Sequence, residues 1–255
     1  MAEIRGLLAA ADAREFPALE EALAADGRKG VRSAVEACRR RLAAEAAEEA
    51  RLEALYAFDR RWGAAETVAG LDEVGRGAVA GPLAVGAVVL PDSPRIPLLN
   101  DSKQLTPAQR EETAARIKEA ALAWSVYYVE PARIDGEGMA ACLRAAFKGA
   151  LDEVEGAGLP LSTVLVDGNP LGIDAREANV VKGDGTSAAI AAASIVAKVE
   201  RDRLMVQLSS TFPQYGFSSH KGYGSAEHIE AIARYGLSPV HRASFCRAFQ
   251  QQSLF

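Results

Sequence analysis

The first 64 residues carry apolar side chains at helical spacing and contain few β-branched residues. Apolar positions three to four residues apart predict the buried stripe of a helix. Between residues 30 and 58 these positions are Val31, Val35, Cys38, Leu42, Ala46, Leu52, Leu55 and Phe58. We therefore expect residues 1–64 to form a helical N-terminal extension that ends at Trp62-Gly63.

From residue 67 the pattern changes to short apolar runs followed by longer helical stretches. Buried strands are expected at residues 67–71, 83–90, 124–129 and 162–166, with a further short strand at 180–181. Residues 106–109 (TPAQ) form a capping box with proline at the first helical position, which opens a helix to about residue 122. Further helices are expected at residues 139–154, 187–208 and 225–235. Strands that come early and helices that come later predict an α/β sheet with mixed strand directions in residues 65–255.

The composition fits one large domain, or an ordinary domain with a small appendage, because 49% of the 255 residues are apolar and 25% are charged. Cys38, Cys142 and Cys246 lie far apart and form no CxxC pair, which argues against a disulfide framework or a zinc site. The apolar stretch 7–11 is interrupted at once by charges, and the run 188–197 is too short to span a bilayer. We expect a cytoplasmic protein that does not enter a membrane.

The net charge of −5 is unlike that of a typical nucleic-acid binder, but the charge is unevenly distributed. Residues 67–197 have a net charge of −6 and residues 198–255 of +3. An acidic metal centre flanked by phosphate-binding cations has this distribution, and chance produces it too. Arg39, Arg40 and Arg41 form a local basic patch that is either a solvated helix face or a nucleic-acid contact.

Acidic residues stand at the ends of predicted strands or where a strand meets a helix. Asp72 and Glu73 follow the first strand, Asp167 follows the strand 162–166, and Asp184 precedes the long helix. Taken singly, each fits a turn or a helix cap. Neighbouring residues on a strand point to opposite faces, so Asp72 and Glu73 can serve one site only if the strand ends there or one acts through its backbone.

Together the four acids are harder to explain as turns, because strand ends converge on one crevice in open α/β sheets. Four carboxylates in one place repel one another unless a divalent cation lies between them. Their hard oxygen ligands suit Mg²⁺ or Mn²⁺. Two such ions roughly 4 Å apart activate water and stabilise the leaving oxygen in phosphodiester cleavage.

A dinucleotide-binding loop is the alternative for residues 75–81, where Gly75, Gly77 and Gly81 are spaced G-x-G-x-x-x-G. Pro82 and a strand-like run follow this loop, whereas a pyrophosphate site needs a helix there. We reject that alternative.

Other polar residues suit a partner that carries phosphate. Ser194 and Lys198 share one face of the expected helix. Cations would bind backbone phosphates, and a tyrosine could stack on a sugar or base, although surface charge and core packing explain the same residues. The three histidines have no zinc-ligand spacing. The polar clusters are Asp101-Ser102-Lys103, Ser194 with Lys198 and Arg201, residues 220–224 (HKGYG) and His241-Arg242.

These segments, in this order and spacing over residues 68–245, resemble bacterial ribonuclease HII. The resemblance implies a ribonuclease-H-like mixed sheet flanked by helices, with the extension 1–64 outside the shared core. The motifs that carry it are DEVGRG (72–77), DSKQL (101–105), VDGN (166–169), KGD (182–184), AAASIVAKVERD (191–202), HKGYG (220–224) and HRASF (241–245).

The resemblance implies an endonuclease that cuts 5′ to a ribonucleotide, in RNA–DNA hybrids or in duplex DNA with embedded ribonucleotides, leaving 3′-hydroxyl and 5′-phosphate ends. It places the catalytic, metal-binding acids at Asp72, Glu73, Asp167 and Asp184, with Mg²⁺ or Mn²⁺ as cofactor. It places substrate binding at Gly75, Arg76, Gly77, Lys103, Ser194, Lys198 and Tyr223. Within that set, the glycine loop senses the 2′-hydroxyl and Tyr223 reads the RNA-to-DNA junction.

Two other functions compete with this interpretation. One is a different nuclease on the same fold, such as another ribonuclease H type or a junction-resolving or transposase-like enzyme, against which the GRG loop and Tyr223 argue. The other is a non-catalytic nucleic-acid-binding protein, which gains nothing from four negative charges beside phosphate. We expect a monomer, and a substrate-gripping role for the extension is a hypothesis.

Overall fold

The computed structural model describes residues 1–63 and 67–250, and the chain falls into two compact units, Met1–Ala54 and Leu55–Phe255. The boundary expected between residues 64 and 65 lies outside the described residues. Helix α3 (Lys29–Gly63) contributes residues to both units. Its last nine residues therefore belong to the second unit.

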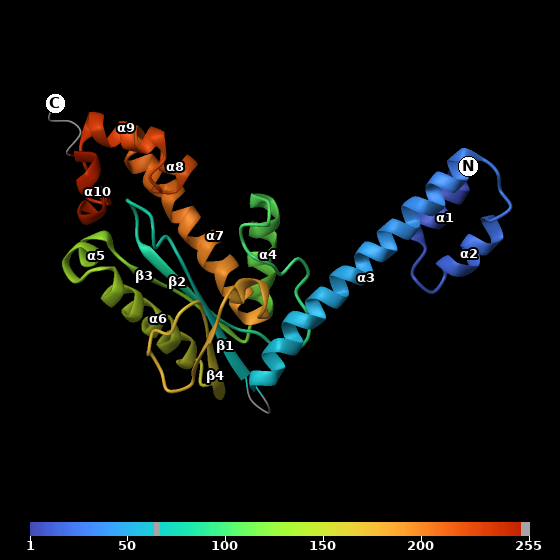
Figure 1. The fold of residues 1–255 in the computed structure, drawn as a ribbon, viewed down its shortest axis with the longest axis horizontal. Helices are drawn as coiled ribbons and strands as arrows, with labels where there is room; N and C mark the ends of the chain where they lie inside the picture. Colours follow the sequence, from blue (N-terminus) through green and yellow to red (C-terminus); the bar gives the residue numbers. More distant parts are fainter. Residues whose placement is uncertain (64–66, 251–255) are drawn as a thin grey trace. The chain divides into compact units, whose positions relative to one another are not determined.

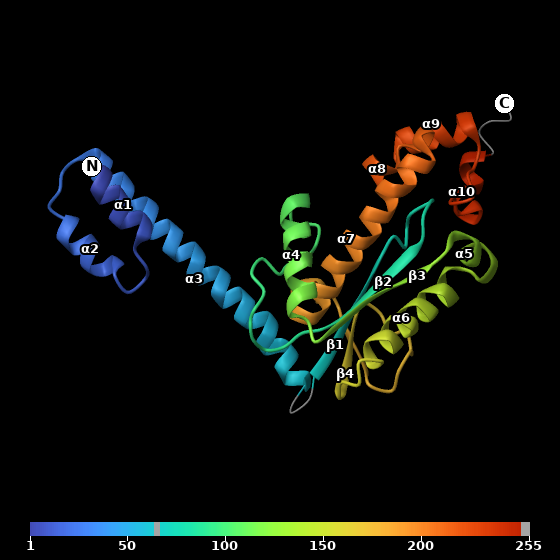
Figure 2. The ribbon, with the colours of Figure 1, turned by 180° about the vertical axis from the view of Figure 1, so that it is seen from behind.

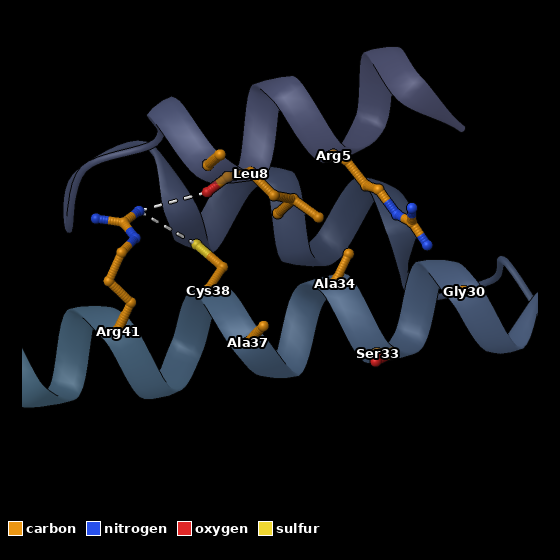
Figure 3. A pocket seen from close by; sticks show the side chains of 9 residues that line it. Arg5, Leu8, Gly30, Ser33, Ala34, Ala37, Cys38 and Arg41 are labelled. Carbon is orange, nitrogen blue, oxygen red and sulfur yellow. Dashed lines mark hydrogen bonds between the residues drawn. The ribbon is translucent and has the colours of Figure 1, made fainter.

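The first unit is helical, as its apolar spacing predicts, but it contains breaks that the spacing does not reveal. Helices α1 (Ala2–Ala10) and α2 (Phe16–Leu23) precede α3. Between α1 and α2, the Asp12 carboxylate accepts hydrogen bonds from the backbone N–H groups of Arg14 and Glu15, both at 2.8 Å, which stabilises a turn. A small core joins the helices, and a cavity of about 400 Å³ lies between α1 and α3 (Figure 3).

The second unit is built on a five-stranded sheet with the order β3-β2-β1-β4-β5 (Figure 1). β1 pairs antiparallel with β2 and parallel with β4, β2 pairs antiparallel with β3, and β4 pairs parallel with β5. The expected mixed sheet is confirmed. The strands are β1 (Thr67–Val74), β2 (Leu83–Val89), β3 (Ala123–Val129), β4 (Leu161–Asp167) and β5 (Glu177–Val180).

Helices α6 (Met139–Glu155) and α7 (Ala188–Thr211) cover opposite faces of the sheet, as Figures 1 and 2 show. The alanine-rich α7 lies very close to the strands. A Cβ atom on Gly70 would come within 2.1 Å of the backbone of Ala189, and one on Gly86 within 2.5 Å of the backbone of Ala193. The two glycines therefore permit the close helix–sheet packing that the small side chains of α7 predict.

The remaining helices of the second unit are shorter than α6 and α7. α4 (Pro107–Ala120) packs on α7 and begins with the predicted capping box, in which the Gln109 N–H donates to the Thr106 hydroxyl. α9 ends before Gly236 as expected. The sequence pattern missed short elements because they span too few residues to show a helical period. The other elements are α5 (Pro131–Glu137), η1 (Gly183–Gly185), η2 (Pro213–Tyr215), α8 (Phe217–His220), α9 (Ala226–Tyr235) and α10 (Ala243–Gln250).

The end of α3 is attached to the second unit by specific hydrogen bonds. The Tyr56 hydroxyl accepts from the Ile96 N–H at 3.1 Å. The buried Asp59 carboxylate accepts from the Ala189 N–H at 2.8 Å, in the first turn of α7. A carboxylate at this position is favoured by the exposed N–H groups and dipole of a helix N-terminus. Within the described part of the chain, no helix combines the length and apolarity that crossing a membrane requires.

Candidate active site

A cavity of about 490 Å³ opens where β1 and β4 end, and it is lined by residues from six separate parts of the chain. All eleven expected site residues line it, together with Val74 and with Ser102, which belongs to the polar cluster 101–103 but was given no role of its own. The lining residues are Asp72, Glu73, Val74, Gly75, Arg76, Gly77, Ser102, Lys103, Asp167, Asp184, Ser194, Lys198 and Tyr223.

β1 does not end before its two acids, which corrects the expected strand 67–71. It continues through Asp72 and Glu73, which pair with Gly86 and Val85 of β2. Only the pairing with β4 stops at Leu71. Asp72 shares the α7-facing side of the strand with Gly70, and Glu73 points to the other face. Both still line one cavity because β1 extends past the last β4 residue with which it pairs.

Asp72 is the most buried of the four acids, and burial raises its pKa to about 7. The negative charges of Asp167 and Glu73 contribute to this rise, and a hydrogen bond from Ser194 opposes it. Burial also raises the pKa of Glu73, against the lowering effect of Arg76. These shifts show that three carboxylates lie close enough to repel one another in a poorly hydrated place.

Asp167 and Asp184 approach the same point from β4 and η1. The Gly183 N–H donates to Asp167 Oδ1 at 2.6 Å. Burial raises the pKa of Asp184, and the charges of Asp101 and Asp167 add to this effect. Lys103 Nζ lies 3.8 Å from Asp184 Oδ2 and 3.7 Å from Asp101 Oδ1. Asp101 is thus a fifth carboxylate near the site, and its role was not predicted.

The chemistry of this donor set fits a divalent cation, because every candidate ligand is a hard carboxylate oxygen. In residues 1–63 and 67–250, however, no three His, Cys, Asp or Glu side chains already stand together as a metal-binding group. The acids are instead turned toward protein donors, such as the Gly183 N–H, Arg76 and Lys103.

Two α7 residues and the loop before α4 supply polar groups beside the acids. Ser194 Oγ lies 3.2 Å from Ser102 Oγ, and both hydroxyls are buried. Lys198 Nζ forms an ion pair with Asp202 at 2.7 Å, one turn further along α7. Because Ser194 and Lys198 both line the cavity, the helix face that their spacing predicts is the one turned toward the acids.

The opposite edge of the cavity is formed by the loop after β1 and by Tyr223. Gly75 has φ = +83°, and a Cβ there would come within 2.2 Å of Arg201 Nε. Only glycine fits that position. A Cβ on Gly77 would meet nothing within 4 Å. Tyr223 is 38% exposed, and the centroid of its ring lies 5.6 Å from the Arg201 guanidinium carbon.

Two fully buried arginines, Arg201 and Arg242, hold this loop, which corrects the phosphate-binding role expected for the cations of their clusters. Arg201 donates to the carbonyls of Pro82, Lys221 and Ala80 at 2.9–3.2 Å. Arg242 donates to the carbonyls of Gly81 and Arg76 at 3.0 and 3.1 Å. Neither guanidinium is exposed, so neither is available to bind phosphate.

The histidines are likewise structural in position. His228 and His241 are buried and hydrogen-bonded to each other, so neither ring is available to bind phosphate.

Comparisons with known proteins agree with the geometry. The family model described as Ribonuclease HII matches residues 69–248, and the Ribonuclease HII N-terminal domain matches residues 1–63. A ribonuclease HII of Levilactobacillus brevis is 44% identical over 224 residues, which cover 88% of this chain and 86% of that protein. The ribonuclease H2 of Pyrococcus horikoshii superimposes with a TM-score of 0.62 at 29% identity, over 73% of this chain and 98% of that one.

A more distant structure, Bst-RNase HIII in complex with Mn²⁺, has a TM-score of 0.64 at 20% identity and shows the shared fold. It covers 77% of this chain and 73% of its own. The matched families span both units, and the cavity at the strand ends lies within the larger match. The chain therefore belongs to the ribonuclease HII family of divalent-metal-dependent, ribonuclease H-type endonucleases.

Proposed function

We propose that the enzyme hydrolyses the phosphodiester on the 5′ side of a ribonucleotide, with Asp72, Glu73, Asp167 and Asp184 holding two Mg²⁺ or Mn²⁺ ions. The observation that carries the proposal is the convergence of the four carboxylates on one cavity, with the pKa of Asp72 raised to about 7 by burial and neighbouring charges. Mutual repulsion of this kind is relieved by a cation. Two bound cations supply an activated water and stabilise the leaving oxygen.

Hydrolysis joins the water oxygen to phosphorus and breaks the bond between phosphorus and the preceding O3′. The departing O3′ takes up a proton, so the products end in a 3′-hydroxyl and a 5′-phosphate. Lys103 and Lys198 line the cavity and carry the charge that binds backbone phosphates. Ser194 donates to Asp72 and so holds that carboxylate toward the cavity.

Recognition of the ribonucleotide is assigned to the loop Gly75–Gly77. Without side chains at positions 75 and 77, the backbone N–H and C=O groups can approach a 2′-hydroxyl, which both donates and accepts hydrogen bonds. The Tyr223 ring, which lines the same cavity, would pack against the next sugar and favour one without a 2′-hydroxyl. The preferred substrate is then an RNA-to-DNA junction, read with little dependence on base sequence.

The test is cleavage of an end-labelled DNA duplex that holds one ribonucleotide. We expect a single cut 5′ to that ribonucleotide, dependent on Mg²⁺ or Mn²⁺, and no cut in an all-DNA duplex. Tyr223→Phe should retain the preference for the junction over an RNA–DNA hybrid, and Tyr223→Ala should lose it. Equal cutting of the all-DNA control would refute the proposal.

The same proposal covers the organisation of the chain. Residues 1–64 form the helical extension and residues 65–255 the catalytic domain, and the enzyme works as a cytoplasmic monomer. The N-terminal unit carries 9 Lys/Arg and 11 Asp/Glu over residues 1–54, a net charge of −2 that does not favour nonspecific binding of nucleic acid. Analytical ultracentrifugation of the full chain, with and without a substrate duplex, tests the monomeric state.

A further inference from the structure

All three histidines of the chain gather in one cluster next to Tyr223. His228 is fully buried at the start of α9, and His241 is nearly so. The His220 ring stacks on His228 with centroids 4.3 Å apart. The helices that carry His220 and His228, α8 and α9, lie beside each other in both Figure 1 and Figure 2. This histidine cluster has no part in the proposed chemistry.

A continuous chain of hydrogen bonds runs through the cluster to the backbone of Tyr223. His241 Nδ1 lies 2.9 Å from the Ser238 backbone N and 2.7 Å from its hydroxyl. His241 Nε2 lies 3.0 Å from His228 Nε2. His228 Nδ1 lies 2.9 Å from the Tyr223 carbonyl oxygen, which also accepts from the Ser225 N–H at 2.9 Å.

The groups at the two ends of the chain fix every proton in it. The Ser238 N–H can only donate, so His241 Nδ1 accepts and the His241 proton is on Nε2. That proton is donated to His228 Nε2. The His228 proton is therefore on Nδ1, where it is donated to the Tyr223 carbonyl, which can only accept. The same tautomers follow from either end.

The cluster is also arranged to stay uncharged. A proton added to His228 would go on Nε2 and place an N–H group against the His241 Nε2–H across the 3.0 Å gap. A proton added to His241 would go on Nδ1 and face the Ser238 N–H, 2.9 Å away. Burial is the main cause that lowers the pKa of His241 to about 4, and the neighbouring His228 and His220 contribute to it. Burial lowers the pKa of His228 as well. The Tyr215 and Phe217 rings pack around both histidines.

We infer that His228 and His241 are positioning residues: they hold the Tyr223 backbone and thereby set the preference for an RNA-to-DNA junction. This rests on the role proposed for Tyr223. Tyr223 is more than a third exposed, so the location of its ring depends on where its backbone is fixed. A misplacement of about 1 Å in a group that positions the substrate can reduce the rate about 100-fold.

The experiment compares two variants of nearly equal size, His228→Asn and His228→Leu. Asparagine keeps an N–H where His228 Nδ1 lies, and leucine does not. The readout is the ratio of kcat/KM on a one-ribonucleotide duplex to kcat/KM on an RNA–DNA hybrid. We expect His228→Leu to reduce the ratio about tenfold or more and His228→Asn to stay within about threefold of the wild-type ratio.

Two controls separate the possible failures. Val154→Ala removes buried methyl groups from α6, in a core cluster that contains neither the histidines nor Tyr223. It should lower stability without changing the ratio of the two kcat/KM values. Tyr223→Ala tests the proposed function itself: if it leaves the ratio unchanged, the role of Tyr223 is wrong. If Tyr223→Ala reduces the ratio and His228→Leu does not, or if the Asn and Leu variants behave alike, the positioning role of His228 is wrong.

Nitrogen NMR of the histidine rings in the wild-type chain tests the same inference without a variant. The Gly222 N–H donates to His220 Nδ1, and the Tyr215 carbonyl accepts a hydrogen bond from His220 Nε2. His220 therefore carries its proton on Nε2. We expect Nε2–H tautomers for His220 and His241 and an Nδ1–H tautomer for His228 at pH 7. A charged His228, or one protonated on Nε2 alone, would overturn the inference.

Discussion

The two sides of the cavity both contain charged groups in poorly hydrated surroundings, but the charges have opposite signs. On the acidic side (Asp72, Glu73, Asp167 and Asp184), carboxylates face one another, and the pKa of Asp72 rises to about 7. On the loop side (Gly75–Gly77 and Tyr223), the buried charge is positive and lies behind the loop, and the pKa of Arg242 falls to about 10. The acidic side needs a cation from outside, whereas the loop side is held by the protein's own cations.

This difference shows where function and support are located. On the acidic side, three of the four proposed metal-binding acids lie at the ends of β1 and β4, where the sheet positions them, and Asp184 lies in η1. On the loop side the functional groups are glycines and an exposed ring, which cannot position themselves. Arg201, Arg242 and the histidine cluster supply that support from elsewhere in the sequence.

The largest effect is expected from Asp72→Asn on the acidic side. Loss of one carboxylate from the centre should reduce cleavage by about 10³-fold or more, because groups that act as a unit fail together. Unfolding should require at least as much free energy as in the wild type at pH 8, because the buried charge is gone. Cleavage assays and chemical denaturation measure the two, with Asp152→Asn, an exposed partner of Lys148, as control. Unchanged cleavage would remove Asp72 from the mechanism.

Asp59 shows what burial alone does to the pKa of a carboxyl group, because no neighbouring carboxylate contributes to its shift. Its pKa is raised to about 6, mainly by burial, and one carboxylate oxygen has no hydrogen-bond partner. A raised carboxyl pKa stabilises the fold below the unfolded value of about 4, and this stabilisation is lost as the pH rises through about 6. The free energy of unfolding of Asp59→Asn, minus that of the wild type, should therefore increase by about 3 kcal/mol between pH 3.5 and pH 8. A constant difference across that range would contradict the raised pKa.

On the loop side, Arg242→Lys should cost about 2 kcal/mol of stability and reduce cleavage. An ammonium group cannot reproduce the guanidinium fork that joins the Gly81 and Arg76 carbonyls. Arg203→Lys on the surface of α7 is the control, since exposed ion pairs contribute little. Equal stability of the two variants, measured by denaturant titration, would mean that the fork does not hold the loop.

The smallest effect is expected from Gly77→Ala, which is compared with Gly75→Ala in the same loop. Gly77→Ala has room for its methyl group, so stability should stay within about 0.5 kcal/mol while KM for the ribonucleotide duplex rises about tenfold. Gly75→Ala should lower stability by about 2 kcal/mol because of its positive φ and the contact with Arg201. Thermal unfolding and steady-state kinetics distinguish them. An unchanged KM in Gly77→Ala would argue against close approach of the substrate to this loop.

Much of the fold follows from local pattern. The strand cores, the capping box at Thr106 and the small-residue face of α7 each depend on neighbouring residues, and the structure confirms them. The extension of β1 through Asp72 and Glu73 was missed because it depends on pairing with β2, which is not a local property. The turn at Asp12 was missed because the helical period continues on both sides of it.

The lining of the site was predictable because its residues occur in short recognisable motifs. The residues that support the site from behind were not predictable, because their types are usually exposed and only the folded structure shows that they are buried. Arg201 and Arg242 are indistinguishable in sequence from phosphate-binding cations, yet both are fully buried. Asp101 contacts Lys103 and influences Asp184 only in the folded chain.

Binding of Mn²⁺ to the full-length protein, followed by calorimetry or electron paramagnetic resonance, tests the central claim most directly. The wild type should bind two Mn²⁺ ions. Each of the variants Asp72→Asn, Glu73→Gln, Asp167→Asn and Asp184→Asn should weaken that binding by about tenfold or more, while Asp152→Asn should not. A wild-type protein that binds no Mn²⁺, or acid variants that bind it as tightly as the wild type, would contradict a shared metal centre.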